Sequence, residues 1–213
     1  IGHPLLYKTR NRIANMKILT LNINSIRAHI ESFMDILRSG EYDVIMVQEL
    51  KVETANFPHT VFDEFGYNIK VFGQKSWNGV ATFSKHSIED VTCGLPTYPD
   101  VNARFLECVV AGRVRLINVY MPNGDLVTSP KFPYKLEWMN AFTQYIEQYL
   151  DSPEPVIIAG DFNVAIQDRD IWNPKNYEGV AISAPAARDI MNKWLSAGWV
   201  DAWRTLHPDD VGY

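Results

Sequence analysis

Polar side chains that could do chemistry come directly after four apolar, β-rich runs of the chain. Functional sites in layered α/β proteins gather at the carboxyl ends of strands, so these side chains are expected to lie close together. Asp161 and Asn163 are two positions apart, and in an extended segment this spacing points both side chains toward the same side. The residues are Asn22, Glu49, Tyr120, Asp161 and Asn163.

This set of residue types suits metal-assisted chemistry on a phosphate group. A carboxylate such as Glu49 is a hard oxygen ligand that suits Mg²⁺ or Mn²⁺. A second carboxylate can orient or deprotonate a water molecule. Amide and phenol groups can donate hydrogen bonds to phosphate oxygens as charge builds up in the transition state. The alternative for any one of these residues is a strand end that simply meets solvent.

The runs that end at these residues read as buried strands. Their apolar residues are continuous and not alternating, which is typical of strands buried on both faces. These runs cover residues 17–21, 43–47, 115–119 and 155–159, and further strands are expected at 67–72, 80–84 and 104–110.

Three apolar stripes at helical spacing predict helices between the strands. Gly40 follows the first stripe and Gly198 the third, where a helix is expected to end. Strands that alternate with helices indicate an α/β layered domain, and the polar segment 169–183 is expected to be a functional or surface loop. The stripes are Ile26, Ile30, Phe33, Met34 and Leu37; Leu136, Met139, Phe142, Ile146 and Leu150; and Ala187, Ile190, Met191, Trp194 and Leu195.

Composition and motifs exclude several other classes of protein. The 213 residues are 46% hydrophobic and 21% charged, which is ordinary for one folded domain, and no run approaches the roughly 20 apolar residues of a membrane span. The chain has no G-x-S-x-G, no P-loop and no G-x-G-x-x-G, so serine-nucleophile and nucleotide-cofactor enzymes have little support. A net charge of −5 argues mildly against a passive nucleic-acid coat, but not against an enzyme that uses a metal ion and a local basic patch.

Four motifs stand at the ends of the expected strands. They read MKILTLNINSIRA at 16–28, VQELK at 47–51, NVYMPNG at 118–124 and GDFNVA at 160–165. Their order and spacing, together with NGVA at 78–81 and GWVDAWR at 198–204, resemble the exonuclease III family of abasic-site endonucleases, within the endonuclease/exonuclease/phosphatase superfamily. The resemblance runs from Met16 to the last residue. It implies a four-layer α/β sandwich with two central mixed sheets flanked by helices, the second sheet being incomplete in this chain.

The resemblance also implies a role for each residue at the strand ends. Glu49 resembles the metal-binding carboxylate of the family, with Asn22 beside it, and Mg²⁺ is the expected ion with Mn²⁺ as an alternative. Tyr120 resembles the tyrosine that contacts the scissile phosphate. Asp161 resembles the aspartate that positions or deprotonates the attacking water, and Asn163 the asparagine that supports it.

Duplex DNA with abasic sites or 3′ ends is the partner that the resemblance implies, without a nucleotide cofactor or a membrane. Arg104 and Lys135 match basic positions near the bound DNA strand, and Lys131 could join them; for all three the alternative is an ordinary solvated charge. The expected activity is metal-dependent hydrolysis of phosphodiester bonds at abasic sites and from 3′ ends.

The two ends of the chain carry separate expectations. Residues 1–15 hold three basic residues and no acid, so we expect a leader or extension outside the fold, with the domain at 16–213. The family's final Ser-Asp-His motif has no counterpart here, which predicts a fragment without the C-terminal part.

The two cysteines favour a reducing compartment. A cytoplasmic location follows as an expectation, or an organellar one if residues 1–15 are a targeting segment.

Two other functions stay open at this point. One is a phosphatase of the same superfamily acting on inositol phosphates or sphingomyelin, although the tyrosine in NVYMPNG and the QELK sequence favour the nuclease. The other is a non-catalytic DNA-binding fragment, which the absent histidine motif supports.

Overall fold

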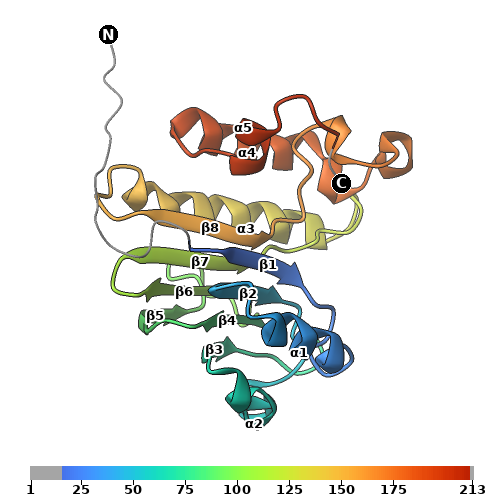
Figure 1. The fold of residues 1–213 in the computed structure, drawn as a ribbon. Coiled ribbons are helices and arrows are strands. Elements are labelled where there is room, and N and C mark those ends of the chain that lie inside the picture. Colours follow the sequence, from blue (N-terminus) through green and yellow to red (C-terminus); the bar gives the residue numbers. More distant parts are fainter. Residues whose placement is uncertain (1–15, 212–213) are drawn as a thin grey trace.

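Two β-sheets pack face to face in the computed structural model, and helices cover the outer face of each sheet (Figure 1). The structure describes residues 16–211, so the predicted leader at 1–15 lies outside the described residues. The four layers confirm the α/β sandwich expected from the resemblance. Each sheet contains both parallel and antiparallel strand pairs.

The first sheet has the strand order β1-β2-β4-β3, and the second has the order β5-β6-β7-β8. β1 runs parallel to β2, and β7 runs parallel to β8, so the carboxyl ends within each pair meet at one edge. Register Asn22↔Gln48 closes the first pair, and register Tyr120↔Asp161 closes the second. The strands of the first sheet are β1 Ile18–Asn22, β2 Val44–Gln48, β3 Asn68–Phe72 and β4 Val80–Ser84. Those of the second are β5 Ile88–Cys93, β6 Phe105–Val110, β7 Val114–Tyr120 and β8 Val156–Asp161.

The helices divide between the two outer faces. α1 packs its apolar stripe on the first sheet and ends at Gly40, whose φ of 60° is the left-handed conformation that glycine adopts without strain. α3 and α4 pack on the second sheet. The α-helices are α1 Ile30–Ser39, α2 His59–Phe62, α3 Lys131–Ile146, α4 Pro185–Ala197 and α5 Ala202–Leu206. Short 3₁₀ turns lie at Thr54–Asn56, Asp63–Phe65, Glu147–Tyr149, Asp168–Asp170, Pro174–Tyr177 and Ala181–Ser183.

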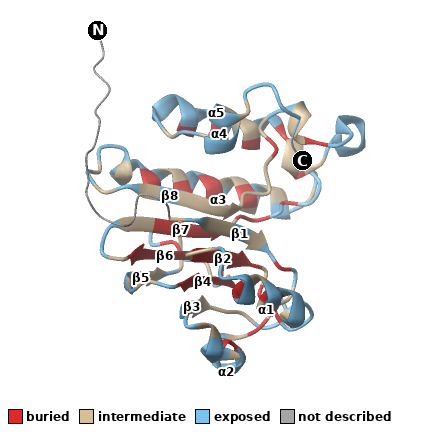
Figure 2. Cartoon of the chain, in the orientation of Figure 1, coloured by how far each residue is buried: buried red, intermediate tan, exposed pale blue. Residues whose placement is uncertain are grey.

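Burial distinguishes central strands from edge strands (Figure 2). β2, β4 and β6 are buried along their whole length, whereas β1 and β8 are partly exposed. The prediction that the runs at 17–21 and 155–159 are buried on both faces is therefore wrong. A continuous apolar run does not show whether a second strand pairs on each side, and β1 and β8 lie at the edges of their sheets, where side chains stay partly exposed.

Four elements differ from the sequence-based expectation. β5, α2 and α5 were not predicted, because β5 mixes charged with apolar residues and the two helices are only four and five residues long. α1 begins at Ile30, although its apolar stripe starts at Ile26, because residues 26–29 form a turn that leads into the helix. Among the described residues, no helix is long and apolar enough to cross a bilayer.

Gly160 allows β8 to lie directly against β7. A Cβ atom at this position would lie 2.0 Å from the carbonyl oxygen of Val119, and the backbone there has a φ of 145°. Gly160→Ala is therefore expected to lower the free energy of unfolding by at least ~3 kcal/mol, the upper range for overpacking a tight site. Urea denaturation of the variant measures the loss.

Gly112→Ala is the matched control, because its Cβ would meet nothing within 4 Å although its φ is also positive at 61°. Left-handed backbone alone costs an alanine roughly 1–2 kcal/mol. Equal losses in the two variants would contradict the steric explanation for Gly160.

Candidate active site

Four strand ends meet at one edge of the two packed sheets. Asn22 ends β1, Glu49 follows β2, Tyr120 ends β7 and Asp161 ends β8. The structure thus brings together residues that are up to 139 positions apart in the chain. The clustering predicted from the strand ends is confirmed, while the chemical role of each residue stays a prediction.

The carboxamide of Asn22 joins the two acidic residues of the site. Its nitrogen donates to Glu49 Oε1 at 2.7 Å and to Asp161 Oδ2 at 2.8 Å. The two N–H groups of one amide can serve one carboxylate each. Asn22 Oδ1 in turn accepts from the backbone N–H of Asn24 at 3.0 Å, which fixes the orientation of the amide.

Glu49 is held as an anion by its neighbours. Burial raises the pKa of its carboxyl group, but hydrogen bonds from Asn22, Lys51 and Tyr120 outweigh burial, and the net pKa is lowered. Lys51 Nζ lies 3.1 Å from Glu49 Oε2. The Glu49 backbone has a φ of 56°, a conformation that is uncommon for a residue with a side chain.

Tyr120 stays protonated at neutral pH. Burial, the charge of Glu49 and the hydrogen bond to Glu49 raise the pKa of its phenol to about 12, although the nearby Arg104 opposes the shift. The guanidinium carbon of Arg104 lies 4.9 Å from the centre of the Tyr120 ring, a distance at which a cation is attracted to the ring face. Tyr120 can therefore act as a hydrogen-bond donor toward an anion.

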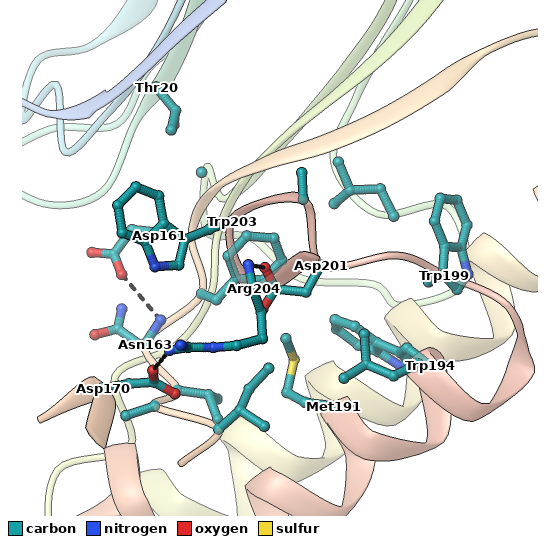
Figure 3. Close-up of a pocket in the computed structure, with 18 of the residues that line it drawn as sticks. Thr20, Asp161, Asn163, Asp170, Met191, Trp194, Trp199, Asp201, Trp203 and Arg204 are labelled. Atoms are coloured by element: carbon teal, nitrogen blue, oxygen red, sulfur yellow. Dashed lines mark hydrogen bonds and ion pairs between the residues drawn. The ribbon is translucent and has the colours of Figure 1, made fainter. Parts of the chain in front are cut away.

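Asp161 is oriented from the loop that follows it. Its Oδ1 accepts from the backbone N–H of Asn163 at 3.0 Å (Figure 3). The side chain of Asn163 donates to the carbonyl of Met121 at 2.9 Å and accepts from Asn123 at 3.1 Å. The loop after β7 is thus connected to the loop after β8.

Lys135 lies beneath these two loops and not at the surface. The sequence predicts a DNA contact for Lys135, whereas its side chain is fully buried and its ammonium donates to the carbonyl oxygens of Asn123, at 3.1 Å, and Asn163. Burial lowers the pKa of this ammonium to about 8, and the charge of Asp161 partly opposes that change. The position on α3 turns Lys135 inward, which the spacing of basic residues alone does not reveal.

The other two predicted basic residues lie in different settings. Arg104 is half-buried and donates to the Tyr120 carbonyl and the Tyr134 hydroxyl, both at 3.2 Å. Lys131 is exposed and lies 3.5 Å from Asp125 in a surface ion pair, a type of contact that contributes little to stability. DNA binding by Arg104 and Lys131 stays a prediction.

A groove of about 850 Å³ extends from Asp161 and Asn163 (Figure 3). Trp194, Trp199 and Trp203 contribute much of its apolar lining. Lys51 and Asn123 also belong to the site, although no role was predicted for their side chains; both stand inside the motifs VQELK and NVYMPNG. Their position three residues beyond a strand end is the signal that could have indicated them.

The oxygen donors of the site fit a hard divalent cation. Mg²⁺ is usually bound by one or two carboxylates, with water and substrate phosphate completing its coordination. Glu49 provides a carboxylate held in its ionised form. Asn22 supports this carboxylate with its Nδ2, while its Oδ1 accepts from the backbone N–H of Asn24. Among the described residues, no group of three or more His, Cys, Asp or Glu side chains could hold a metal ion by itself, so water and substrate phosphate would have to supply the remaining ligands.

Comparison with known proteins agrees with the fold. A model of the Endonuclease/Exonuclease/phosphatase family matches residues 19–212. The chain is 31% identical over 204 residues to exodeoxyribonuclease III of Haemophilus influenzae, covering 91% of this chain and 76% of that protein. The chain belongs to the Endonuclease/Exonuclease/phosphatase family, which confirms the resemblance.

Solved structures give the same result. An AP endonuclease from Archaeoglobus fulgidus superposes with a TM-score of 0.88 at 34% identity, covering 93% of this chain and 77% of that one. A 3′ phosphatase from Neisseria, NExo, bound to a product DNA hairpin, superposes with a TM-score of 0.87 at 33% identity, covering 92% and 76%. The four-layer fold is therefore shared with enzymes that act on DNA ends or AP sites.

The burial of Lys135 predicts a pH dependence of stability. The pKa of Lys135 is about 8 in the folded chain against an ordinary 10.5, so between these values the unfolded state binds more protons and stability rises with pH. The gain of the wild type over Lys135→Met from pH ~7 to ~10 is expected to approach about 3 kcal/mol. Urea denaturation at both pH values measures this gain.

Lys193→Met provides the control, because Lys193 is exposed on α4. We expect this variant to follow the pH dependence of the wild type. A Lys135→Met protein with that same dependence would show that the ammonium is not buried in its charged form.

Proposed function

We propose that this chain is a divalent-metal-dependent DNA-repair nuclease that hydrolyses phosphodiester bonds at abasic sites and from the 3′ ends of duplex DNA. The observation that carries the proposal is the Asn22 amide, which holds Glu49 and Asp161 together beside Tyr120. Two carboxylates in fixed positions and a neutral donor match the needs of a reaction at an anionic phosphate.

Each carboxylate has a separate task in this proposal. A phosphodiester repels hydroxide, so the reaction needs positive charge near the phosphate and a water molecule held in line. Glu49 would hold Mg²⁺, or Mn²⁺ in its place, with Asn22 beside it fixing the carboxylate through its Nδ2, and the bound ion would neutralise charge on the phosphate oxygens. Asp161 accepts a hydrogen bond from the water and takes its proton as the new bond to phosphorus forms, while the P–O3′ bond breaks and the departing 3′ oxygen takes a proton from solvent to become a hydroxyl.

Neutral donors complete the site. Tyr120 keeps its proton because its pKa is about 12, and it donates to a phosphate oxygen as charge increases in the transition state. Asn163 holds Asp161 through its backbone N–H. Arg104, stacked on Tyr120, adds positive charge on the side where the DNA backbone would lie.

The identity of the substrate is supported by the relatives. Exodeoxyribonuclease III of Haemophilus influenzae and the AP endonuclease of Archaeoglobus fulgidus both resemble this chain over more than 90% of its length. The Neisseria enzyme is described with a product DNA hairpin, which supports duplex DNA as the partner. Specificity for an abasic site would come from a flipped or collapsed sugar that enters where a base would be blocked.

The Neisseria relative favours a second candidate, removal of a 3′ phosphate from DNA. It is described as a 3′ phosphatase and is 33% identical to this chain. The same site could attack a terminal phosphomonoester, because water, carboxylate and donors would keep their places. Substrates with a 3′ phosphate and with an internal abasic site distinguish the two candidates.

Nicking of a duplex with one abasic site, in Mg²⁺, tests the proposed function. Asp161→Asn is expected to reduce the rate by at least ~10²-fold, the size expected for loss of a general base, while leaving DNA binding intact. EDTA is expected to abolish cleavage. Asp151→Asn, an exposed aspartate in the turn before β8, is the matched control and should cleave at the wild-type rate.

Binding of the duplex without any Mg²⁺-dependent cleavage would instead support a non-catalytic DNA-binding role. Cleavage of a phosphomonoester but not of abasic DNA would support the phosphatase. Cleavage that survives Asp161→Asn would show that this carboxylate does not act on the water.

Lys131 provides a separate test of the DNA path. Removing one phosphate contact is expected to weaken binding for all sequences alike and to reduce the slope of log K against log salt by about 1. Lys131→Ala is therefore compared with Lys17→Ala, whose ammonium pairs with Glu41 beyond the opposite end of β1. An unchanged slope in Lys131→Ala would place the DNA elsewhere.

A further inference from the structure

The candidate site is divided between the two sheets. Asn22 and Glu49 belong to β1 and to the end of β2, in the first sheet, whereas Tyr120 and Asp161 belong to β7 and β8, in the second. The separation of Glu49 from Tyr120 therefore depends on how one sheet lies on the other. Both cysteines are free, so no disulfide fixes that relation.

Most of the layer between the sheets cannot fix it either. Its side chains are apolar, and apolar burial stabilises contact without specifying direction. Cores of this kind accept alternative packings when total volume is kept. The apolar residues of the layer include Val44, Met46, Val80, Leu106, Cys108, Val110 and Leu116.

Two buried amide side chains in this layer form directional hydrogen bonds between the sheets. Gln48 on β2 and Asn118 on β7 are 1% and 0% exposed, and Gln48 Nε2 donates to Asn118 Oδ1 at 2.8 Å across the gap between the sheets. Asn118 Nδ2 donates back to the first sheet, to the carbonyl of Ala81 at 2.8 Å and that of Val47 at 3.3 Å. Gln48 Nε2 also lies 3.1 Å from Thr20 Oγ1 on β1.

This pair lies directly beneath the reacting groups. Gln48 is followed by Glu49, and Asn118 precedes Tyr120 by two residues on the same face of β7. Glu49 and Tyr120 are themselves hydrogen-bonded to each other. The inter-sheet amides and the Glu49–Tyr120 contact thus form two successive connections between the same strands.

We infer that Gln48 and Asn118 are positioning residues, which fix the register of the two sheets so that Glu49 and Tyr120 meet in the geometry that the reaction needs. The inference rests on the proposed function of the site. Gln48 and Asn118 are buried and do not contact substrate. Under this inference they affect turnover and not substrate binding.

Replacing both amides by apolar side chains of similar size tests this inference. Gln48→Met with Asn118→Leu leaves no unpaired amide from the pair itself, so the fold is expected to persist. The kcat of abasic-site cleavage is expected to fall about 10²-fold, the cost of a displacement of about 1 Å at a reacting centre, with KM unchanged. Thr82→Val, which removes a buried hydroxyl from the same layer, is the matched control and should keep the wild-type kcat.

An NMR measurement tests the positioning role without depending on catalytic activity. The ¹³Cζ resonance of Tyr120, assigned with Tyr120→Phe, reports the hydrogen bond to Glu49. We expect it to move in the apolar double variant and to stay in place in Thr82→Val. Wild-type cleavage decides the proposed function, whereas this resonance decides the positioning role even if no DNA is cut.

An apolar double variant with wild-type kcat and an unmoved Tyr120 resonance would overturn the inference. If that variant does not fold, Gln48→Asn with Asn118→Gln keeps one amide on each sheet and the total volume. This exchanged pair is expected to retain kcat within ~10-fold of the wild type, because the amide contact across the sheets is kept. The inference would also be overturned if the exchanged pair lost its kcat entirely while the Tyr120 resonance stayed at its wild-type position.

Discussion

The face-to-face packing of β2 and β4 against β6 and β7 is the constraint on which the rest of this molecule depends. These strands are almost entirely buried (Figure 2). β2 and β7 lead to Glu49 and Tyr120, and their parallel neighbours β1 and β8 end at Asn22 and Asp161. Hydrophobic packing sets the distance between the two sheets, whereas directional hydrogen bonds set their register: the amides of Gln48 and Asn118 beneath the site, and the bond from Asn22 to Asp161 at the site itself.

Electrostatic balance follows from that arrangement. Glu49 and Asp161 are like charges brought close together, which would raise the pKa of one of them in the absence of other groups. The neutral amide of Asn22 separates the two carboxylates, and Lys51 lies beside Glu49. The buried ammonium of Lys135 adds positive charge from below, which reduces the repulsion between the two carboxylates.

Backbone strain gathers in the loops that carry the site. Several residues with side chains have positive φ there, each at a cost of about 1–3 kcal/mol in the less populated regions. They include Asn24, Ser25, Glu49, Lys51, Asn78 and Asn163. Their conformations are maintained by bonds between loops, such as Ser25 N to Glu49 O at 2.8 Å and Lys51 N to Asn78 O at 2.9 Å. The buried central strands thus stabilise the fold enough to hold these strained loops in place at the strand ends.

The sequence by itself determined the strands that end at the site, the three long helices, the layered fold and the family. These features follow from local patterns, since apolar runs, helical stripes and motif spacing are properties of neighbouring residues. The tertiary structure decided which strands lie at the edges, that Lys135 faces inward, and that Asn22 joins Glu49 to Asp161, which lies 139 positions after Asn22 in the chain. Those outcomes depend on contacts between distant segments, whose geometry is set by packing and not by any local pattern.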